Sequence, residues 1–255
     1  MKKEYRDNVE IILVSPSEPG NIGGTARAMN NMGFSHLGLV TPVDYKIPET
    51  YKFAWNSHEI VDNAKVYDSI PSAIKDKGYV VAMSTRKGRD RGRFEVLNDV
   101  VPEIHELAAK TKVAVIFGCE SWGLTNDDLL HANRVVRIHT ADKFPSLNLS
   151  QAVLVTCYEL FNSKAKIDRD RLEPASREAL ELCFTHIEKV LAMIGYGDRG
   201  DRLLPKNIIK SVKKLVGRAI LDPHEVAMLR GMCSQVEKTI EGFKLRKDKQ
   251  DGIEK

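Results

Sequence analysis

Short apolar runs alternate with helix-like stretches from residue 9 to residue 162, and this alternation constrains the fold more than any other feature. The runs are continuous and rich in β-branched residues, as is typical of strands whose two faces are both covered by helices. The sequence therefore predicts an α/β fold, with a parallel sheet flanked by helices. We expect strands at 9–15, 37–40, 79–84, 112–118 and 134–138, and helices near 22–32, 98–109, 125–132 and 148–162.

The character of the chain changes after residue 163. Residues 164–174 are mostly charged or small and include a proline, which is typical of a linker. Apolar residues then recur at helical spacing, so we expect a small all-helical extension at 175–242. Residues 243–255 are basic and low in hydrophobicity, and we expect a disordered tail there. The sequence thus predicts a first domain at 1–163, a linker, a helical C-terminal extension and a tail.

Composition narrows the classes of protein that the chain can belong to. Its formal net charge of +4 is compatible with a nucleic-acid partner but is also common without one. The four cysteines lie far apart, and neither they nor the histidines have the spacing of a metal site. Scattered cysteines suit a reducing compartment. The first apolar run is too short for a signal peptide, and no run approaches the ~20 residues of a membrane span. We expect a cytoplasmic protein with no membrane and no metal.

The stretch EPGNIGGTARAMNNMG follows the first predicted strand and is rich in glycine. Its glycines leave the backbone bare where another group approaches closely, and Asn21 is placed to cap the following helix. Arg27 is the only charged residue in the helical part, and it points away from the apolar face. A functional loop explains these residues, and so does a tight strand-to-helix turn with a surface arginine.

Two later loops gather similar polar groups. In VIFGCESWGLTNDDLL, Glu120 follows the end of a strand, where open α/β sheets bind ligands, and Thr125 with Asp128 predicts a capping box. In FPSLNLSQAV, Ser146 and Asn148 offer a hydroxyl and an amide just before a helix. Each residue alone could be a solvated loop residue or a helix cap. Three such loops in one chain favour a common site.

One glycine motif points elsewhere. GYGDRG, at residues 195–200, matches the G-x-G-x-x-G pattern of dinucleotide-binding loops, which would suggest an oxidoreductase. That pattern requires a strand before it and a helix after it, whereas here a predicted helix comes before. The segment therefore favours a helix end followed by a loop.

The segments NIGGTARAMNNMGF, FGCESWGL and SLNLSQAV together resemble the three motifs of the SpoU (TrmH-like) branch of the SPOUT RNA methyltransferases, in order and spacing. VVAMSTRKGR and VKKLVGRAILDPHEVAMLRGM are similar to segments of its tRNA 2′-O-methyltransferase subgroup, called TrmJ, although Cys119 stands where that subgroup usually has arginine. The resemblance implies an α/β-knot fold with a C-terminal trefoil knot, the cofactor S-adenosylmethionine, a homodimer, and methylation of nucleotide 32 in the tRNA anticodon loop. A ribosomal RNA substrate and a non-catalytic RNA-binding homologue remain alternatives.

The resemblance also assigns roles to individual residues. The catalytic candidates are Arg27, Asn21, Glu120, Ser146 and Asn148. The cofactor contacts are expected at Met83, Ser84, Thr85, Gly118, Ile138, Pro145, Ser146 and Leu147. Arginine is a poor base because its pKa lies above about 12. We therefore expect Arg27 to orient the ribose 2′-hydroxyl and to stabilise the negative charge that develops on it.

Two cationic segments are candidates for RNA binding. The loop RKGRDRGR, at 86–93, concentrates arginines that suit phosphate groups. A C-terminal helix carries a second group of cations around Lys206, Lys210 and Arg218, and its apolar face has to dock against the rest of the extension. The expected RNA-binding residues are Arg86, Lys87, Arg89, Arg91, Arg93, Lys213 and Lys214.

Overall fold

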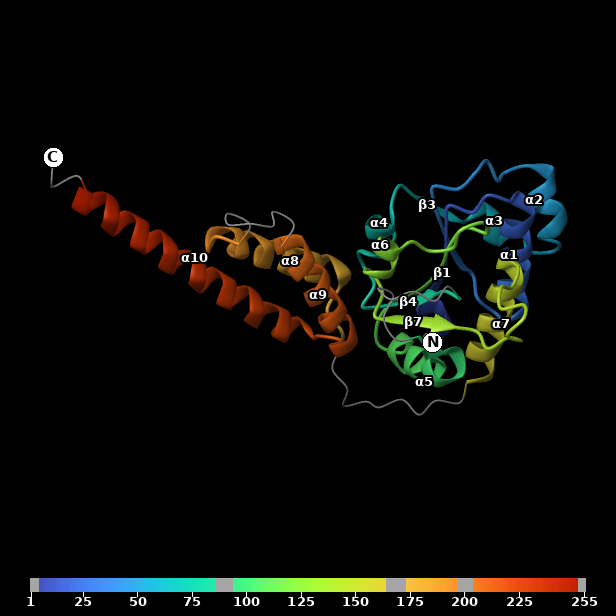
Figure 1. Cartoon of the computed structure of the whole chain (residues 1–255). Helices are drawn as coiled ribbons and strands as arrows, with labels where there is room; N and C mark the ends of the chain where they lie inside the picture. The colour runs from blue at the N-terminus through green and yellow to red at the C-terminus, as the bar shows by residue number, and fades with distance from the viewer. Residues whose placement is uncertain (1–4, 86–93, 164–172, 197–203, 252–255) are drawn as a thin grey trace. The chain divides into compact units, whose positions relative to one another are not determined.

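The computed structural model describes residues 5–85, 94–163, 173–196 and 204–251, and the expected linker and the loop at 86–93 lie outside these ranges apart from the linker's last two residues (Figure 1). The chain divides into two compact units, Met1–Arg177 and Glu178–Lys255. Each unit is described separately below.

The first unit is built on a parallel sheet. Within the described residues it has seven strands in the order β3-β2-β1-β6-β4-β7-β5, and every neighbouring pair is parallel. The strands are β1 (Val9–Val14), β2 (His36–Val40), β3 (Lys65–Tyr67), β4 (Tyr79–Met83), β5 (Glu95–Val96), β6 (Val113–Phe117) and β7 (Arg134–Arg137). The five predicted strands are all present, and the parallel α/β arrangement is confirmed.

The apolar sequences of β1, β6 and β4 explain why these strands lie in the middle of the sheet. Every residue of β4 and β6 is buried, because helices cover both faces of the sheet. The register pairs Phe117 at the end of β6 with Leu13 of β1 and with Met83 of β4. The carboxyl ends of these strands therefore lie side by side, and the loops that follow them meet at one edge of the sheet.

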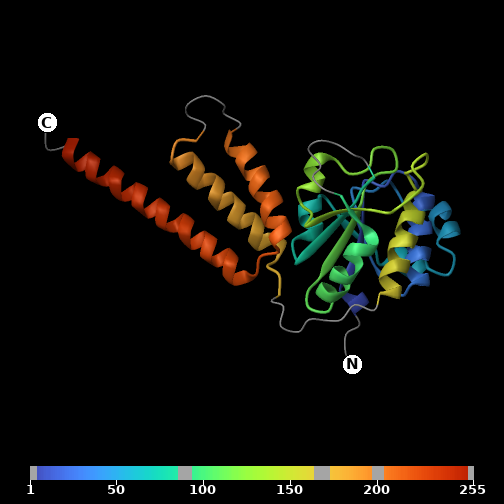
Figure 2. The same cartoon turned by 60° about the horizontal axis from the view of Figure 1, so that its bottom comes forward.

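Helices lie on both faces of the sheet (Figure 2). On one face, α4 and α6 pack on a core that includes Ile12, Val80 and Ile116. On the other face lie α1, α7 and α5, with α2 and α3 beside α1. The helices of this unit are η1 (Tyr5–Asn8), α1 (Pro19–Asn31), α2 (Pro48–Phe53), α3 (His58–Asp62), α4 (Ile70–Ile74), α5 (Leu97–Ala108), α6 (Asn126–Leu129) and α7 (Leu149–Asn162).

The glycines of α1 are needed for helix packing. A Cβ atom on Gly23 would lie 2.0 Å from the carbonyl oxygen of Thr50 in α2, and one on Gly24 would lie 3.0 Å from the Cβ of Ser150 in α7. The sequence predicted that another group approaches this backbone closely. In the structure that group is a pair of neighbouring helices, which hold α1 from two sides.

The second unit is helical, with α8 (Arg177–Met193), α9 (Leu204–Ala219) and α10 (Pro223–Asp251). Phe184 of α8, Val216 of α9 and Val226 of α10 are buried together with other apolar residues. Gly195, with φ of 89°, follows the end of α8, and the N–H groups of Gly195 and Tyr196 bond back to that helix. The first part of GYGDRG is therefore a helix end, as the sequence predicted.

Helix α10 continues through residue 251, within the segment 243–255 for which we expect a disordered tail. That segment contains four lysines, and lysine has high helix propensity, so its composition also suits a helix. Disorder of the tail stays a prediction.

Candidate active site

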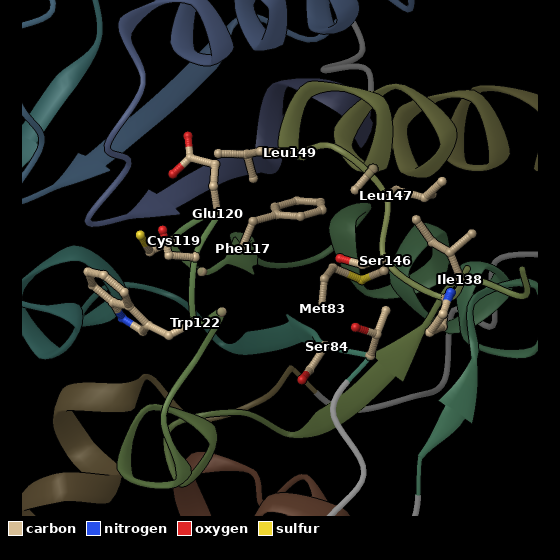
Figure 3. Close-up of a pocket in the computed structure, with 16 residues that line it drawn as sticks. Met83, Ser84, Phe117, Cys119, Glu120, Trp122, Ile138, Ser146, Leu147 and Leu149 are labelled. Carbon is tan, nitrogen blue, oxygen red and sulfur yellow. The ribbon is translucent and has the colours of Figure 1, made fainter. Parts of the chain in front are cut away.

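A cavity of about 340 Å³ lies at the carboxyl ends of β4, β6 and β7, closed by the loop before α7 (Figure 3). All eight residues predicted as cofactor contacts line it, namely Met83, Ser84, Thr85, Gly118, Ile138, Pro145, Ser146 and Leu147. They come from four separate segments of the chain. Parallel pairing brings the ends of β4, β6 and β7 together, which explains how these distant residues share one cavity.

The loop after β6 is tightly closed. A Cβ atom on Gly118 would lie 2.1 Å from the backbone carbon of Gly123, so only glycine fits there. Gly123 has φ of 67° and donates its N–H to the carbonyl oxygen of Cys119 at 2.7 Å. This turn exposes the backbone of its glycines to the cavity and fixes the direction in which the Glu120 side chain leaves the loop.

A chain of hydrogen bonds joins the three polar loops that the sequence singled out. The Asn21 side-chain amide donates to Oε1 of Glu120 at 2.9 Å, and the Asn148 amide donates to Oδ1 of Asn21 at 2.8 Å. Oδ1 of Asn148 accepts from the backbone N–H of Ser150 at 3.0 Å and from its hydroxyl at 2.7 Å. The predicted convergence of these loops is therefore realised in atomic contacts.

The direction of this chain follows from the charge at its end. An ionised carboxylate only accepts hydrogen bonds, so Asn21 has to present its N–H₂ group to Glu120. That leaves the Asn21 oxygen for Asn148, whose own oxygen then caps the N-terminus of α7. Glu120 thereby sets the orientation of two amides.

Glu120 itself is held by several donors. Burial alone would raise its pKa, but the backbone N–H of Ser17 at 3.0 Å, the Asn21 amide and the Ser17 hydroxyl at 2.9 Å together bring the pKa below its usual value of 4.5. The carboxylate is thus ionised at neutral pH. Because its oxygens are occupied by donors, its arrangement suits positioning better than proton transfer.

The cap predicted for Asn21 needs correction, whereas the catalytic role expected for Arg27 stays a prediction. Asn21 does not cap α1, because the helix already begins at Pro19 with Glu18 at the N-cap position, and no side chain bonds there. The Asn21 amide is used across the fold instead. Arg27 is exposed on α1, as expected, but it is not among the residues that line the cavity. Of the five catalytic candidates, Glu120 and Ser146 line the cavity, and Asn21 and Asn148 are bonded to Glu120 and to each other.

The cavity has further walls that sequence reasoning did not assign. These residues are Phe117, Cys119, Ser121, Trp122, Gly123, Leu149 and Ala152. Most of them are adjacent in sequence to predicted residues, and no pattern in the sequence marks them as part of a site. Trp122 is different, because a tryptophan in a polar loop between Glu120 and a glycine is a visible signal.

The RNA-binding candidates are placed in different ways. Arg86, Lys87, Arg89, Arg91 and Arg93 lie outside the described residues. Lys213 faces α8, where its Nζ is 2.7 Å from Oε2 of Glu181 and 5.3 Å from the ring centre of Phe184. Only 17% of its side chain is exposed, and the RNA contact expected at Lys213 stays a prediction. Lys214 is exposed on α9, as are Lys206, Lys210 and Arg218, which repeat at four-residue spacing.

Two kinds of feature are absent from the part of the chain that the structure describes. No helix there combines the length and apolarity needed to cross a membrane. No group of three or more His, Cys, Asp or Glu side chains in the same ranges is arranged to hold a metal ion.

Comparison with known proteins decides the family. Residues 8–158, more than half of the chain, match the model of the SpoU rRNA methylase family. The chain belongs to the SpoU rRNA methylase family. As a SpoU family member it is a methyltransferase, and the resemblance found in its three motifs is confirmed. Residues 178–245 match the model of the C-terminal domain of the tRNA methyltransferase TrmJ.

Individual relatives agree with this assignment over nearly their whole length. The tRNA (cytidine/uridine/adenosine-2′-O-)-methyltransferase TrmJ of Pseudomonas aeruginosa is 31% identical over 94% of this chain and 98% of its own. The tRNA (cytidine-2′-O-)-methyltransferase TrmJ of Methanocaldococcus jannaschii is 33% identical over 85% of this chain and 94% of its own. The crystal structure of TrmJ from Z. mobilis ZM4 superposes with a TM-score of 0.79, at 31% identity, over 89% of this chain and 98% of that one. The SpoU α/β fold is thereby confirmed, and the trefoil knot stays a prediction.

Proposed function

We propose that this SpoU family member transfers a methyl group from S-adenosylmethionine to a ribose 2′-hydroxyl of tRNA, at nucleotide 32 of the anticodon loop. The observation that carries the proposal is the cavity at the sheet edge, where eight residues from four segments meet beside the Glu120–Asn21–Asn148 chain. The tRNA part rests on the relatives, which are named as tRNA 2′-O-methyltransferases and match this chain along nearly its whole length. A tRNA substrate would make the enzyme cytoplasmic.

The cavity suits a nucleoside-containing cofactor. Its volume of about 340 Å³ lies within the ~300–1,000 Å³ of small-molecule sites. Met83, Ile138 and Leu147 offer apolar surface for an adenine ring, and the missing side chain of Gly118 exposes backbone groups. Ser84, Thr85 and Ser146 add hydroxyls that can bond polar groups of the cofactor. When bound, S-adenosylmethionine would supply an electrophilic methyl group and leave as S-adenosylhomocysteine, while the proton of the 2′-hydroxyl would pass to solvent.

The residues of the chain would then position the acceptor. A transferred methyl group needs an oxygen in line with the breaking bond, so orientation can provide much of the rate. Glu120 fixes Asn21 and Asn148 through the hydrogen-bonded chain. Arg27 would orient the ribose hydroxyl and stabilise its developing charge. Since Arg27 lies outside the cavity wall, it would reach the acceptor only when RNA or a second copy of the chain brings them together.

A homodimer is part of the proposal. Helix α7 exposes Leu154, Tyr158 and Phe161 at helical spacing, and exposed apolar side chains on one helix face are typical of an interface. The same helix begins at Asn148, whose amide joins Asn21. A second copy bound to α7 would therefore lie close to the loops that line the cavity.

The exposed cations of α9 would hold the RNA. Lys206, Lys210, Lys214 and Arg218 recur every four residues, so they share one face of the helix. Such a row suits a line of phosphates, which bind cations without regard to base sequence. The loop at 86–93 would contribute further contacts.

The deciding experiment is transfer of labelled methyl groups from S-adenosylmethionine to unmodified tRNA and, separately, to ribosomal RNA, with the modified nucleotide then mapped. We expect a 2′-O-methyl group at nucleotide 32 of tRNA. Methylation of ribosomal RNA alone would keep the chemistry and overturn the substrate. That second candidate is favoured by the name of the matching family model. Transfer to neither RNA would overturn the proposal in favour of a non-catalytic RNA-binding protein.

A further inference from the structure

Trp122 is a large aromatic side chain that the proposed mechanism leaves without a role. It lines the cavity, yet 52% of its surface is exposed to solvent. Among the residues that the structure describes, no hydrogen bond holds its indole N–H. An exposed tryptophan at a cavity wall presents both a flat apolar ring and a polar tip to a ligand.

The turn that carries Trp122 is firmly anchored. Cys119 before it is buried, and Gly123 after it is bonded back to the Cys119 carbonyl at 2.7 Å. Glu120 is fixed by Ser17 and Asn21. The backbone under the indole is therefore set by the same contacts that organise the catalytic candidates, and the ring it carries forms part of the cavity wall.

The position of Trp122 in the cavity separates it from the proposed cofactor contacts. In Figure 3 it lies beside Cys119 and Glu120, at the opposite side of the cavity from Ile138 and Leu147. None of the eight proposed cofactor contacts lies between residues 119 and 123. On this assignment of the cofactor contacts, the wall that contains Trp122 remains for the acceptor RNA.

We propose that Trp122 stacks on an unpaired base of the acceptor RNA, next to the ribose that receives the methyl group. This inference rests on the proposed function, because a 2′-hydroxyl acceptor brings its own base to the cavity. Unpaired RNA bases are commonly bound by stacking on aromatic side chains, and every base has a face that can stack. Stacking would hold the nucleotide while leaving the choice of base open.

Tryptophan fluorescence tests the contact directly. The chain has two tryptophans, and Trp55→Phe leaves Trp122 as the single emitter. Trp55 is exposed on the loop after α2 and has no part in the proposed site. The protein is first saturated with S-adenosylhomocysteine, so that no turnover occurs, and an unmodified anticodon stem-loop RNA is then added. We expect the RNA to quench Trp122, and the same RNA lacking the base at the target nucleotide to leave the emission near its starting value.

Two results of this titration would overturn the inference. Quenching that is complete with S-adenosylhomocysteine alone would place Trp122 on the adenine of the cofactor. Equal quenching by the intact and abasic RNAs would show that a phosphate or sugar contact changes the emission, without stacking.

Kinetics provide an independent reading. Trp122→Ala should raise the KM for RNA by about 5- to 150-fold, the range that corresponds to losing one base–aromatic stack, while Trp122→Phe should keep most of the affinity. Binding of S-adenosylhomocysteine, measured by calorimetry, should stay unchanged in both variants. The Trp55→Phe protein is the control. If the control methylates RNA and Trp122→Ala methylates it with the same KM, the stacking role of Trp122 is wrong and the proposed function stands. If the control methylates no RNA at all, the proposed function itself is contradicted.

Discussion

The side-chain amide of Asn21 donates a 2.9 Å hydrogen bond to the carboxylate of Glu120, which lies 99 residues further along the chain. The bond joins the first turn of α1 to the loop after β6. Because Asn148 bonds to the other end of the same amide, a change at Glu120 is transmitted to the N-terminus of α7.

Glu120→Gln should disturb the whole hydrogen-bonded chain. The new amide has one acceptor, so it cannot satisfy both the Ser17 donors and the Asn21 donor. We expect a loss of about 1–3 kcal/mol in the free energy of unfolding, measured by chemical denaturation, together with a lower rate of methyl transfer. Glu59→Gln, at an exposed position on α3, is the matched control. Equal stability of the two variants would contradict a positioning role for Glu120.

The pH dependence of stability should differ between the wild type and Glu120→Gln. The pKa of Glu120 is lower in the folded protein than its ordinary value of 4.5. Its stabilising contribution is therefore present above pH 4.5 and is lost as the pH falls through the lower, folded-state pKa. The difference in Tm between the two proteins should be largest near neutral pH and should shrink below pH 4.5. A difference that stays constant down to strongly acidic pH would argue against this ionised carboxylate.

Gly118→Ala should close the cavity or unfold its wall. Its Cβ would lie 2.1 Å from the backbone of Gly123, which neither a rotamer change nor a side-chain shift can relieve. We expect loss of S-adenosylhomocysteine binding in calorimetry. Gly123→Ala is the comparison, since a Cβ there meets nothing within 4 Å and only the φ of 67° is strained, at a cost of about 1–2 kcal/mol. Normal binding by Gly118→Ala would show that the loop moves freely.

Lys213 and Lys214 are neighbours in sequence, but replacing them with alanine should affect different properties of the protein, stability for Lys213 and tRNA binding for Lys214. Lys213→Ala removes the 2.7 Å ion pair with Glu181 and should lower the unfolding temperature. Lys214 is exposed, so Lys214→Ala should lower that temperature less than Lys213→Ala does. It should weaken tRNA binding and reduce the slope of log affinity against log salt concentration by about 1. Binding isotherms at several salt concentrations check this. An unchanged slope would show that α9 makes no phosphate contact through Lys214.

Arg27→Ala should abolish turnover without removing the cofactor site. Arg27 is exposed and lies outside the cavity wall, so calorimetric binding of S-adenosylhomocysteine should persist. The rate of methyl transfer should fall by about 100-fold or more, as expected for losing a donor to a developing oxyanion. Normal turnover by this variant would remove Arg27 from the mechanism.

The regular parts of the fold could be predicted because they carry strong local patterns. Strands β4 and β6 are continuous apolar runs, and the capping box of Thr125 and Asp128 is present as expected, with hydrogen bonds of 2.8 and 3.1 Å. The sequence did not predict η1, the strands β3 and β5, with three and two residues, or the short helices between β2 and β4. Elements of one or two turns have no period to detect, and tertiary packing decides their form.

It was easier to predict which residues belong to the site than to predict which of them contact one another. The motifs singled out residues that the structure brings together, but the partners of Asn21 lie 99 and 127 residues away, so sequence favoured a local cap instead. The orientation of Lys213 could not be predicted either. One residue along a helix turns a side chain by about 100°, which is enough to exchange the exposed position of Lys214 for the partly buried ion pair of Lys213.

Helix α1 fixes the distance between Asn21 and Arg27. Gly23 and Gly24 let α2 and α7 press against its backbone, so the helix can neither tilt nor slide between them. Asn21 and Arg27 stand six residues apart on this rod, which corresponds to a rise of about 9 Å. The helix thus keeps a constant separation between the Asn21 amide, which is bonded to Glu120 at the cavity, and the exposed guanidinium of Arg27. If Asn21 and Arg27 act on one substrate as proposed, the groups of that substrate that they contact have to be separated by a matching length.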